Sequence, residues 1–177
     1  MTKTLVTGGV RSGKSRYAEQ LFSADAEIAY LAPGYLADAA ADPEWAARVA
    51  SHQRRRPANW QTVETLDLAH ALDGTELPAL IDCVGIWVTR MVDALGGWDR
   101  PEQDWRPDFD AEVERLAAAV TAHWASVVLV SNEVGWGVVP PTAAGRVFAD
   151  LLGYTNQRLG GVCDRVVLMV AGRVLEL

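Results

Sequence analysis

The sequence predicts an α/β protein whose mostly parallel central sheet is covered by helices on both faces. Short runs of apolar and β-branched residues alternate with longer segments of helical periodicity. The short runs are apolar throughout, as expected of strands that are buried on both faces of a parallel sheet. The chain has 177 residues, which fits one domain with a core of its own. We therefore expect residues 1–177 to form a single domain.

The first half of the chain begins with a β-branched strand, followed by a helix that starts at a lysine. Farther along, Pro43–His52 is predicted to be helical, because Trp45 and Val49 lie four residues apart and share a helix face. Leu80–Cys83 is an apolar run of strand length, and a helix is expected after it, to about Leu95. The other elements predicted in this half are strands at Thr4–Thr7, Glu27–Ala32 and Trp60–Val63 and a helix at Lys14–Phe22.

The second half contains the most periodic helical segment. Phe109–Trp124 places Val113 and Leu116 on one face. The preceding stretch, Gly96–Asp108, is polar and rich in proline, so we expect a solvated surface loop, although its length also allows a functional lid. The other elements predicted here are a strand at Val127–Ser131, a helix at Thr142–Leu159, and a terminal hairpin of Arg165–Val170 and Arg173–Leu177 that turns at Ala171–Gly172.

The overall composition excludes several classes of protein. Sixteen basic and twenty-three acidic residues give a net charge of −7, which argues against a general nucleic-acid or membrane-surface binder. Apolar runs such as Val166–Ala171 are far shorter than the roughly 18 residues of a membrane span, and the N-terminus has no signal-peptide core. We therefore expect no membrane insertion and a cytoplasmic location. Cys83 and Cys163 are too few for a disulfide scaffold and are expected to be small buried apolar groups.

A phosphate-binding loop is the clearest functional motif. The segment GGVRSGKS matches GxxxxGK[ST], a pattern expected by chance about 0.001 times in a chain of this composition. Its glycines allow backbone N–H groups to turn toward phosphate oxygens, whereas a glycine-rich turn without a ligand is the weaker alternative. Lys14 would reach the β- and γ-phosphates, and Ser15 would bind Mg²⁺. The nucleotide-binding candidates in this loop are Gly8, Gly9, Val10, Arg11, Ser12, Gly13, Lys14 and Ser15.

An acidic residue at the end of a neighbouring strand is the usual second contact of that Mg²⁺. Asp82 ends the run Leu80–Asp82, and Glu133 follows the strand at Val127–Ser131. The carboxyl ends of parallel strands meet where such sheets bind ligands. Asp82 is the better metal candidate and Glu133 the second, and for each of them a helix cap or a solvated acid is the alternative.

A histidine beside three arginines is the second functional candidate. His52 precedes Gln53, and the run Arg54–Arg56 follows. Arginine binds phosphate through two parallel hydrogen bonds, and a histidine can attack phosphorus and hold a covalent intermediate. A cationic end of a helix explains the same residues equally well. His70 and His123, by contrast, are expected to be structural or solvated.

Four blocks make the chain resemble the bifunctional adenosylcobinamide kinase/adenosylcobinamide-phosphate guanylyltransferase family of cobalamin biosynthesis. They cover nearly the whole chain. The blocks are TGGVRSGKSRYAE (Thr7–Glu19), DPEWAARVASHQRRRPANWQTVE (Asp42–Glu64), IDCVGIWVTRMVDALGG (Ile81–Gly97), and VVLVSNEVGWGVVP (Val127–Pro140) followed by FADLLGYTNQRL (Phe148–Leu159). The histidine block and the SNEVGxGxVP string are each more specific than the phosphate loop.

The resemblance implies a P-loop NTPase fold of the RecA-like type and two reactions at one site. A nucleoside triphosphate, ATP or GTP, phosphorylates the hydroxyl of adenosylcobinamide. GTP then gives GMP to a histidine, and the phosphorylated cobinamide accepts it. The family positions assign His52 as the nucleophile, and Lys14 of the phosphate loop is the second catalytic candidate. They also imply a homotrimer. The further nucleotide contacts implied are Pro33, Gly34, Tyr35, Gln53, Arg54, Arg55, Arg56, Glu64 and Asp82.

Several positions depart from the family pattern. Gly85 and Arg90 stand where Thr and Asn are more usual, Pro33 replaces a small polar residue, and Leu36–Asp42 is slightly longer than is typical. These departures can alter the corrinoid or guanine contacts. Two other functions remain as hypotheses: a monofunctional P-loop kinase of a small metabolite, and a non-catalytic nucleotide-binding module. Four tryptophans offer flat surfaces to a corrinoid, although burial is the favoured interpretation for Trp87, Trp98, Trp105 and Trp136.

Overall fold

A largely parallel sheet forms the centre of the molecule. The structure is a computed structural model that describes residues 1–35 and 40–177. Among these residues, seven strands form one sheet in the order β3-β2-β4-β5-β1-β6-β7. Neighbouring strands are parallel from β3 to β6, and β7 is antiparallel to β6. The strands are β1 (Lys3–Gly8), β2 (Ala29–Ala32), β3 (Gln61–Glu64), β4 (Ala79–Asp82), β5 (Val127–Val130), β6 (Arg165–Val170) and β7 (Arg173–Glu176).

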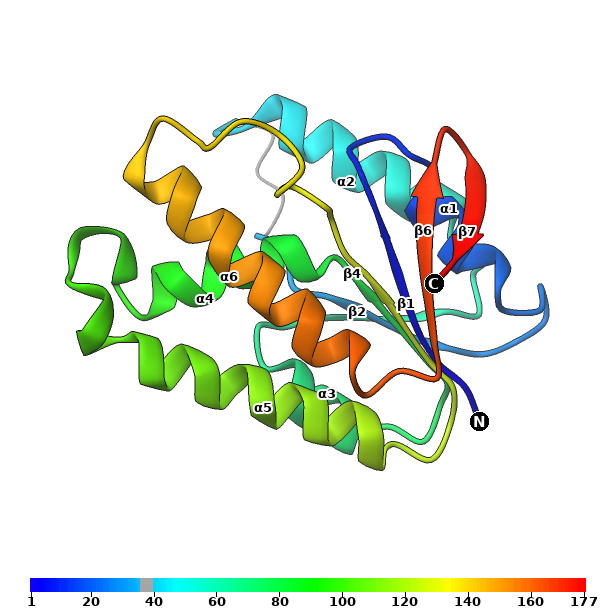
Figure 1. Cartoon of the computed structure of the whole chain (residues 1–177). Helices are drawn as coiled ribbons and strands as arrows, with labels where there is room; N and C mark the ends of the chain where they lie inside the picture. The colour runs from blue at the N-terminus through cyan, green and yellow to red at the C-terminus, as the bar shows by residue number, and fades with distance from the viewer. Residues whose placement is uncertain (36–39) are drawn as a thin grey trace.

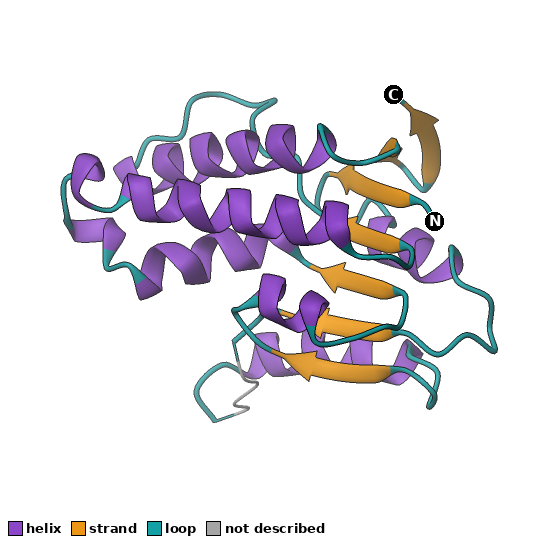
Figure 2. Ribbon diagram, turned by 90° about the horizontal axis from the view of Figure 1, so that it is seen from below, coloured by secondary structure: helices purple, strands orange, loops and turns teal. Residues whose placement is uncertain are grey.

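Helices connect the parallel strands and cover the sheet (Figures 1 and 2). They are α1 (Lys14–Gln20), α2 (Pro43–Arg55), α3 (Leu68–Asp73), α4 (Val84–Ala94), α5 (Arg106–Ala122) and α6 (Ala143–Gly160), with short 3₁₀ turns at Gly97–Asp99 and Glu102–Asp104. None of the helices in the described part of the chain is long and apolar enough to cross a membrane. The predicted α/β fold, with its mostly parallel sheet and terminal hairpin, is confirmed.

Two apolar layers hold the helices against the sheet. One layer joins the sheet to α3, α4, α5 and α6 and contains Leu129, Trp87 and Phe109. The other lies under α1 and contains Tyr30 and Trp60. Strand β5 is fully buried along its length, as its unbroken apolar sequence predicts. Helix α2 differs, because none of its residues is buried. It lies above the end of the sheet at which β1 and β4 finish (Figure 1).

The boundaries of two predicted elements near the site were wrong. The helix expected to end at His52 continues to Arg55, so His52 lies inside its last turn. The helix begins at the N-cap Asp42, whose side chain accepts a hydrogen bond from the backbone N–H of Trp45. Strand β3 starts after Trp60 rather than at it, and that indole is buried. Of the lengthened stretch Leu36–Asp42, residues 36–39 lie outside the described part of the chain.

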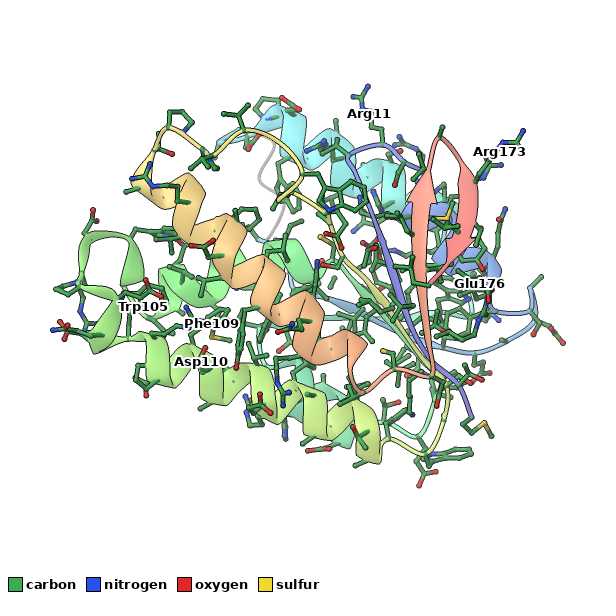
Figure 3. The ribbon with its side chains drawn as sticks, in the orientation of Figure 1. Arg11, Trp105, Phe109, Asp110, Arg173 and Glu176 are labelled. Atoms are coloured by element: carbon green, nitrogen blue, oxygen red, sulfur yellow. The ribbon has the colours of Figure 1, made fainter. Side chains whose placement is uncertain are left out.

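The polar stretch Gly96–Asp108 is more ordered than a solvated loop. It contains the two 3₁₀ turns, and α5 begins within it at Arg106 because proline is tolerated in the first turn of a helix. Trp105 is 1% exposed and meets Phe109 edge-to-face, with 6.5 Å between the ring centroids. Figure 3 labels both side chains at the start of α5. Trp105 therefore anchors this stretch in the core, although the polar composition of the stretch does not indicate it.

Candidate active site

The loop between β1 and α1 has the backbone that a phosphate loop requires. Gly13 has a φ of 96°, a left-handed value that suits glycine. At Gly8, a Cβ atom would lie 2.6 Å from the carbonyl oxygen of Met169 and 2.7 Å from Ser12 Oγ. Larger residues at these two positions would therefore strain or displace the loop. Arg11, at the exposed tip of the loop, projects outward in Figure 3.

Two polar side chains of the loop, those of Ser12 and Lys14, are buried. Lys14 Nζ donates to the carbonyl oxygen of Gly9 at 3.2 Å. Burial lowers the pKa of Lys14, while the nearby Cys83 and Asp82 act in the opposite direction. Ser12 Oγ is buried and has no hydrogen-bond partner in the described part of the protein. Because buried polar atoms are normally paired, this hydroxyl favours a bound ligand with polar oxygens.

Asp82 lies at the end of β4, with one strand, β5, between it and the phosphate-loop strand β1. Its side chain is 6% exposed, and Oδ1 lies 3.5 Å from Ser15 Oγ. Burial alone would raise the pKa of this carboxyl. Hydrogen bonds and charge from His52, together with hydrogen bonds from Tyr30 and Ser15, outweigh it and leave the pKa below its usual value. The side chain is therefore held as a carboxylate beside the phosphate loop.

The last turn of α2 places His52 against that carboxylate. His52 Nδ1 lies 3.4 Å from Asp82 Oδ2. An Nη2 of Arg55 is also 3.3 Å from Nδ1, but Arg55 already donates to both oxygens of Glu19, at 3.0 and 3.2 Å. Because a carboxylate only accepts, we assign a proton on Nδ1 to the 3.4 Å contact with Asp82, and in the neutral ring the lone pair is then on Nε2.

The three arginines after His52 have three different environments. Arg55 forms its ion pair with Glu19 of α1. Arg56 lies over the ring of Tyr30, with 3.5 Å from its Cζ to the ring centroid, and donates to Thr62 Oγ1 at 3.2 Å. Arg54 is exposed. The run of basic residues therefore does not act as one phosphate clamp.

Side chains of α2 and α4 fix the segment after β2. Arg90 Nη1 donates to the carbonyl oxygens of Pro33 and Gly34, each at 2.8 Å. Trp45 Nε1 donates to the carbonyl oxygen of Tyr35 at 3.0 Å. Two of the departures from the family pattern, at positions 33 and 90, are thus in direct contact.

One cleft collects most of these residues. Its volume is about 1010 Å³, within the size range of ligand pockets. Predicted site residues that line it are Val10, Arg11, Ser12, Gly13, Lys14, Ser15, Gly34, Tyr35, His52, Gln53, Arg55, Arg56, Glu64 and Asp82. Predicted residues outside the lining set are Gly8, Gly9, Pro33, Arg54 and Glu133.

Glu133, the second metal candidate, is hydrogen-bonded to Asn156 and not to Ser15. Its Oε1 accepts from Asn156 Nδ2 at 3.3 Å, and burial raises the pKa of its carboxyl. Within residues 1–35 and 40–177, no group of three or more His, Cys, Asp and Glu side chains could hold a metal ion. Mg²⁺ needs no such group, because one or two protein oxygens together with substrate phosphates suffice. Ser15 Oγ and Asp82 Oδ1 fit that requirement, whereas a metal contact by Glu133 stays a prediction.

The sequence analysis missed Tyr30 and overestimated the burial of one tryptophan. Tyr30 lines the cleft and donates to Asp82 Oδ2 at 3.0 Å. A tyrosine within an apolar strand was the available signal, because a buried hydroxyl needs a partner. The prediction of burial holds for Trp87 and Trp105 and is wrong for Trp136, which is 71% exposed.

The other two histidines were expected to be structural or solvated, and one of each is found. His123 is buried just after α5, and its Nε2 lies 2.9 Å from the carbonyl oxygen of Leu77. His70 is exposed. His52 is therefore the histidine of the cleft.

The fold and the cleft together define a P-loop nucleotide-binding enzyme. A solved structure described as a prototypical ATPase from the type III secretion system of pathogenic bacteria is similar in fold, with a TM-score of 0.57 and 11% identity. The similarity covers 94% of this chain and 50% of that one. At that identity it supports the P-loop fold class and nothing finer.

Sequence comparison identifies the family. A model of the family described as cobinamide kinase / cobinamide phosphate guanyltransferase matches residues 4–177. The bifunctional adenosylcobalamin biosynthesis protein CobU of Salmonella typhimurium is 41% identical over 177 residues, covering 95% of each chain. The bifunctional adenosylcobalamin biosynthesis protein CobP of Pseudomonas aeruginosa is 38% identical, and the match covers 99% of this chain and 96% of that one. The chain therefore belongs to the cobinamide kinase / cobinamide phosphate guanyltransferase family. It is a kinase and guanylyltransferase of cobalamin biosynthesis, and this function is favoured over a kinase with a single activity.

Proposed function

We propose that both reactions of this enzyme take place in the one cleft, with His52 as the residue that carries GMP. The observation that supports this most directly is the 3.4 Å approach of His52 Nδ1 to Asp82, whose other oxygen lies beside Ser15 of the phosphate loop. A nucleophile and a triphosphate site are thus within reach of each other. All of these residues come from one sheet and its helices, which supports a single catalytic domain over residues 1–177.

In the kinase reaction, the hydroxyl of adenosylcobinamide attacks the γ-phosphorus of ATP or GTP and loses its proton to water. The bond between that phosphorus and the β-γ bridging oxygen breaks, and the nucleoside diphosphate leaves. The backbone of Gly8–Lys14 holds the phosphates, and the Lys14 ammonium contacts the oxygens on which negative charge grows. Ser15 Oγ and Asp82 Oδ1 would hold Mg²⁺, which would neutralise charge on the phosphates.

In the guanylyl-transfer reaction, the Nε2 lone pair of His52 attacks the α-phosphorus of GTP. An N–P bond forms, the bond to the bridging oxygen breaks, and pyrophosphate leaves with that electron pair. Asp82 holds the Nδ1 proton and stabilises the positive charge of the ring. A phosphate oxygen of phosphorylated adenosylcobinamide then attacks the same phosphorus, and the product takes GMP while His52 returns to its free form.

The guanine side of the cleft is proposed at its far wall. Glu64 lies at the end of β3, opposite Ala32 of β2, and lines the cleft. Its carboxylate can accept hydrogen bonds from guanine N1–H and N2–H₂ or from the ribose. Gly34 and Tyr35 form the adjoining wall, and Gln53 offers a further polar contact.

The homotrimer rests on the family resemblance, the cytoplasmic location rests on the composition of the sequence, and both stay predictions. Sedimentation equilibrium of the purified chain tests the first, with a mass of three chains expected against the 19.2 kDa of one.

Covalent labelling tests the role of His52. The protein is incubated with Mg²⁺ and GTP labelled at the α-phosphorus, then denatured and examined for bound label. We expect acid-labile label on the wild type and none on His52→Ala, with phosphorylation of adenosylcobinamide largely retained in the variant. His70→Ala is the matched control, because His70 is exposed and outside the cleft lining. Equal labelling of His52→Ala would assign the nucleophile to another residue. A wild type that binds GTP and takes up no label would leave only the kinase reaction at this cleft.

A further inference from the structure

We propose that Tyr30 is a positioning residue for guanylyl transfer, because it fixes the Asp82 oxygen that faces His52. This inference rests on the proposed role of His52 in the guanylyl-transfer reaction. It assigns the two oxygens of Asp82 to different tasks, Oδ1 to the phosphate loop and Oδ2 to the nucleophile.

The contacts of Asp82 divide between its two oxygens. Oδ1 lies 3.5 Å from Ser15 Oγ, on the side of the phosphate loop. Oδ2 accepts from the Tyr30 hydroxyl at 3.0 Å and lies 3.4 Å from His52 Nδ1. Tyr30 and His52 therefore share one oxygen, and the shorter contact is that of Tyr30. A carboxylate that is held in this way presents a fixed lone pair to Nδ1 and so fixes the direction of Nε2.

The fold holds the Tyr30 ring firmly. Tyr30 is 1% exposed, within β2 of the sheet. Trp60 stacks near it, with 6.1 Å between centroids and 26° between the ring planes. The guanidinium of Arg56 lies 3.5 Å from the ring centroid and is in turn tied to Thr62 of β3. The hydroxyl therefore has little freedom, and it donates to Asp82 in the site.

This arrangement also explains the position of Arg56. Its sequence position beside His52 suggests contact with phosphate, yet its Cζ lies over the Tyr30 ring and Nη1 binds Thr62. A cation over an aromatic face stabilises the ring beneath it. Arg56 thus supports the residue that orients Asp82, and α2 carries both the nucleophile and this support.

The two reactions should depend on Tyr30 to different degrees. The kinase reaction uses the Oδ1 side of Asp82 and the phosphate loop. Guanylyl transfer uses these and also the contact of Oδ2 with His52. Loss of the Tyr30 hydroxyl removes the shorter of the two contacts of Oδ2 and leaves the contact with His52. The attacking geometry is then less well defined, while GTP binding is unaffected.

Tyr30→Phe tests the proposal, because it removes the hydroxyl and keeps the ring between Trp60 and Arg56. The measurement is the single-turnover rate constant for GMP attachment to His52 across GTP concentrations, alongside kcat for phosphorylation of adenosylcobinamide. We expect the rate constant at saturating GTP to fall about tenfold, as for loss of a hydrogen bond to a charged group. The half-saturating GTP concentration and the kinase kcat should change less than about twofold. Tyr154→Phe is the matched control, because Tyr154 lies on α6 near Arg106 and outside the cleft lining.

Three results would overturn the proposal. One is an unchanged rate constant at saturating GTP in Tyr30→Phe. Another is an equal loss of both reactions, which would make the hydroxyl part of the general structure of the site. The third is a wild type that takes up no label. This result contradicts the proposed role of His52, on which the role of Tyr30 rests, and the wild-type protein alone reveals it. If Tyr30→Phe does not fold, Thr62→Val replaces it, since Thr62 is exposed and anchors Arg56. A smaller loss confined to guanylyl transfer is then expected, and the absence of such a loss counts against the proposal.

Discussion

Arg90 is a single residue on which one wall of the cleft depends. Its guanidinium leaves α4 and donates to two consecutive carbonyl oxygens, those of Pro33 and Gly34. It also lies 5.2 Å from the centroid of the Tyr35 ring. An arginine can do this because its donors spread in one plane from a long side chain, whereas the asparagine more usual at this position in the family is too short. Arg90 therefore holds the backbone of Pro33 and Gly34 in place.

Arg90→Asn is expected to weaken GTP binding and to leave the chemistry intact. Two hydrogen bonds to the segment Pro33–Tyr35 are lost. Their loss costs about 1–2 kcal/mol of binding free energy, which corresponds to a rise of about tenfold in KM for GTP. The rate constant for His52 labelling at saturating GTP should stay close to that of the wild type. Initial rates across GTP concentrations measure both quantities. An unchanged KM would show that this wall does not contact the nucleotide.

At this scale the sequence predicts residue types better than their contacts. The phosphate loop and the acid at the end of β4 follow from local patterns, so the sequence alone points to Lys14, Ser15 and Asp82. The pairing of Asp82 with His52 and Tyr30 could not be found in this way, because it joins segments that are 30 and 52 residues away along the chain. The spacing of residues in a motif carries no information about such contacts. The three arginines show the same limit, since each faces a different partner.

Among the contacts between structural elements, one joins the terminal hairpin to the phosphate loop. The backbone N–H of Gly172, in the turn between β6 and β7, donates to the carbonyl oxygen of Ser12 at 3.0 Å. The Gly172 Cα would lie 3.6 Å from a Cβ atom at Gly13. The hairpin therefore does more than close one edge of the sheet. It also holds the phosphate loop, although the hairpin lies at the opposite end of the chain from that loop.

Gly172→Val tests this brace. Gly172 has a φ of 76°, a left-handed conformation that a β-branched residue adopts at a cost of about 1–3 kcal/mol. The turn is expected to rearrange and to lose its bond to Ser12. GTP should then bind about threefold to tenfold more weakly, and the melting temperature should fall by several degrees. Gly153→Ala, in the open on α6, is the control and should keep full GTP affinity. GTP titration and thermal unfolding of both variants decide the matter, and an unaltered affinity in Gly172→Val would leave the hairpin without a role in the site.

The elements themselves were largely predictable, and the exceptions have physical reasons. Periodicity located α5 and α6, and turn residues located the hairpin. The end of α2 was misplaced because the run Gln53–Arg55 continues the helix through polar residues, which carry no apolar signal. The stretch Gly96–Asp108 was judged by its polar composition, yet one tryptophan anchors it in the core. In both cases local composition gave way to contacts with distant parts of the chain.

At the scale of the whole molecule, the cleft lies where five connections of the parallel sheet meet. The phosphate loop follows β1, the segment Pro33–Tyr35 follows β2, Glu64 ends β3, Asp82 ends β4, and Asn132 follows β5. Ligands bind at this end of parallel sheets because the loops after the strands converge there. A mostly parallel sheet was predicted, but the order of its strands was not, since strand order depends on which buried faces meet. The site is therefore a property of the complete sheet.

A ligand that binds such a cleft should stabilise the entire fold. In the proposed site, GTP with Mg²⁺ would contact loops that follow most of the strands, and we expect it to bind only the folded state. At a GTP concentration of one hundred times Kd, the stabilisation is about 2.7 kcal/mol, or a rise of about 5–11 °C in melting temperature for a chain of this size. Lys14→Ala should lose most of that rise, and His52→Ala should keep most of it, because in the proposed mechanism Lys14 binds the phosphates, whereas His52 attacks the α-phosphorus after GTP has bound. Removal of Mg²⁺ by a chelator should reduce the rise in the wild type and return it when Mg²⁺ is restored. Thermal unfolding with and without GTP and Mg²⁺ measures all of these shifts. A rise in Lys14→Ala as large as in the wild type would place the triphosphate away from the phosphate loop, and then the geometry that joins His52 to Ser15 through Asp82 could not serve the reaction.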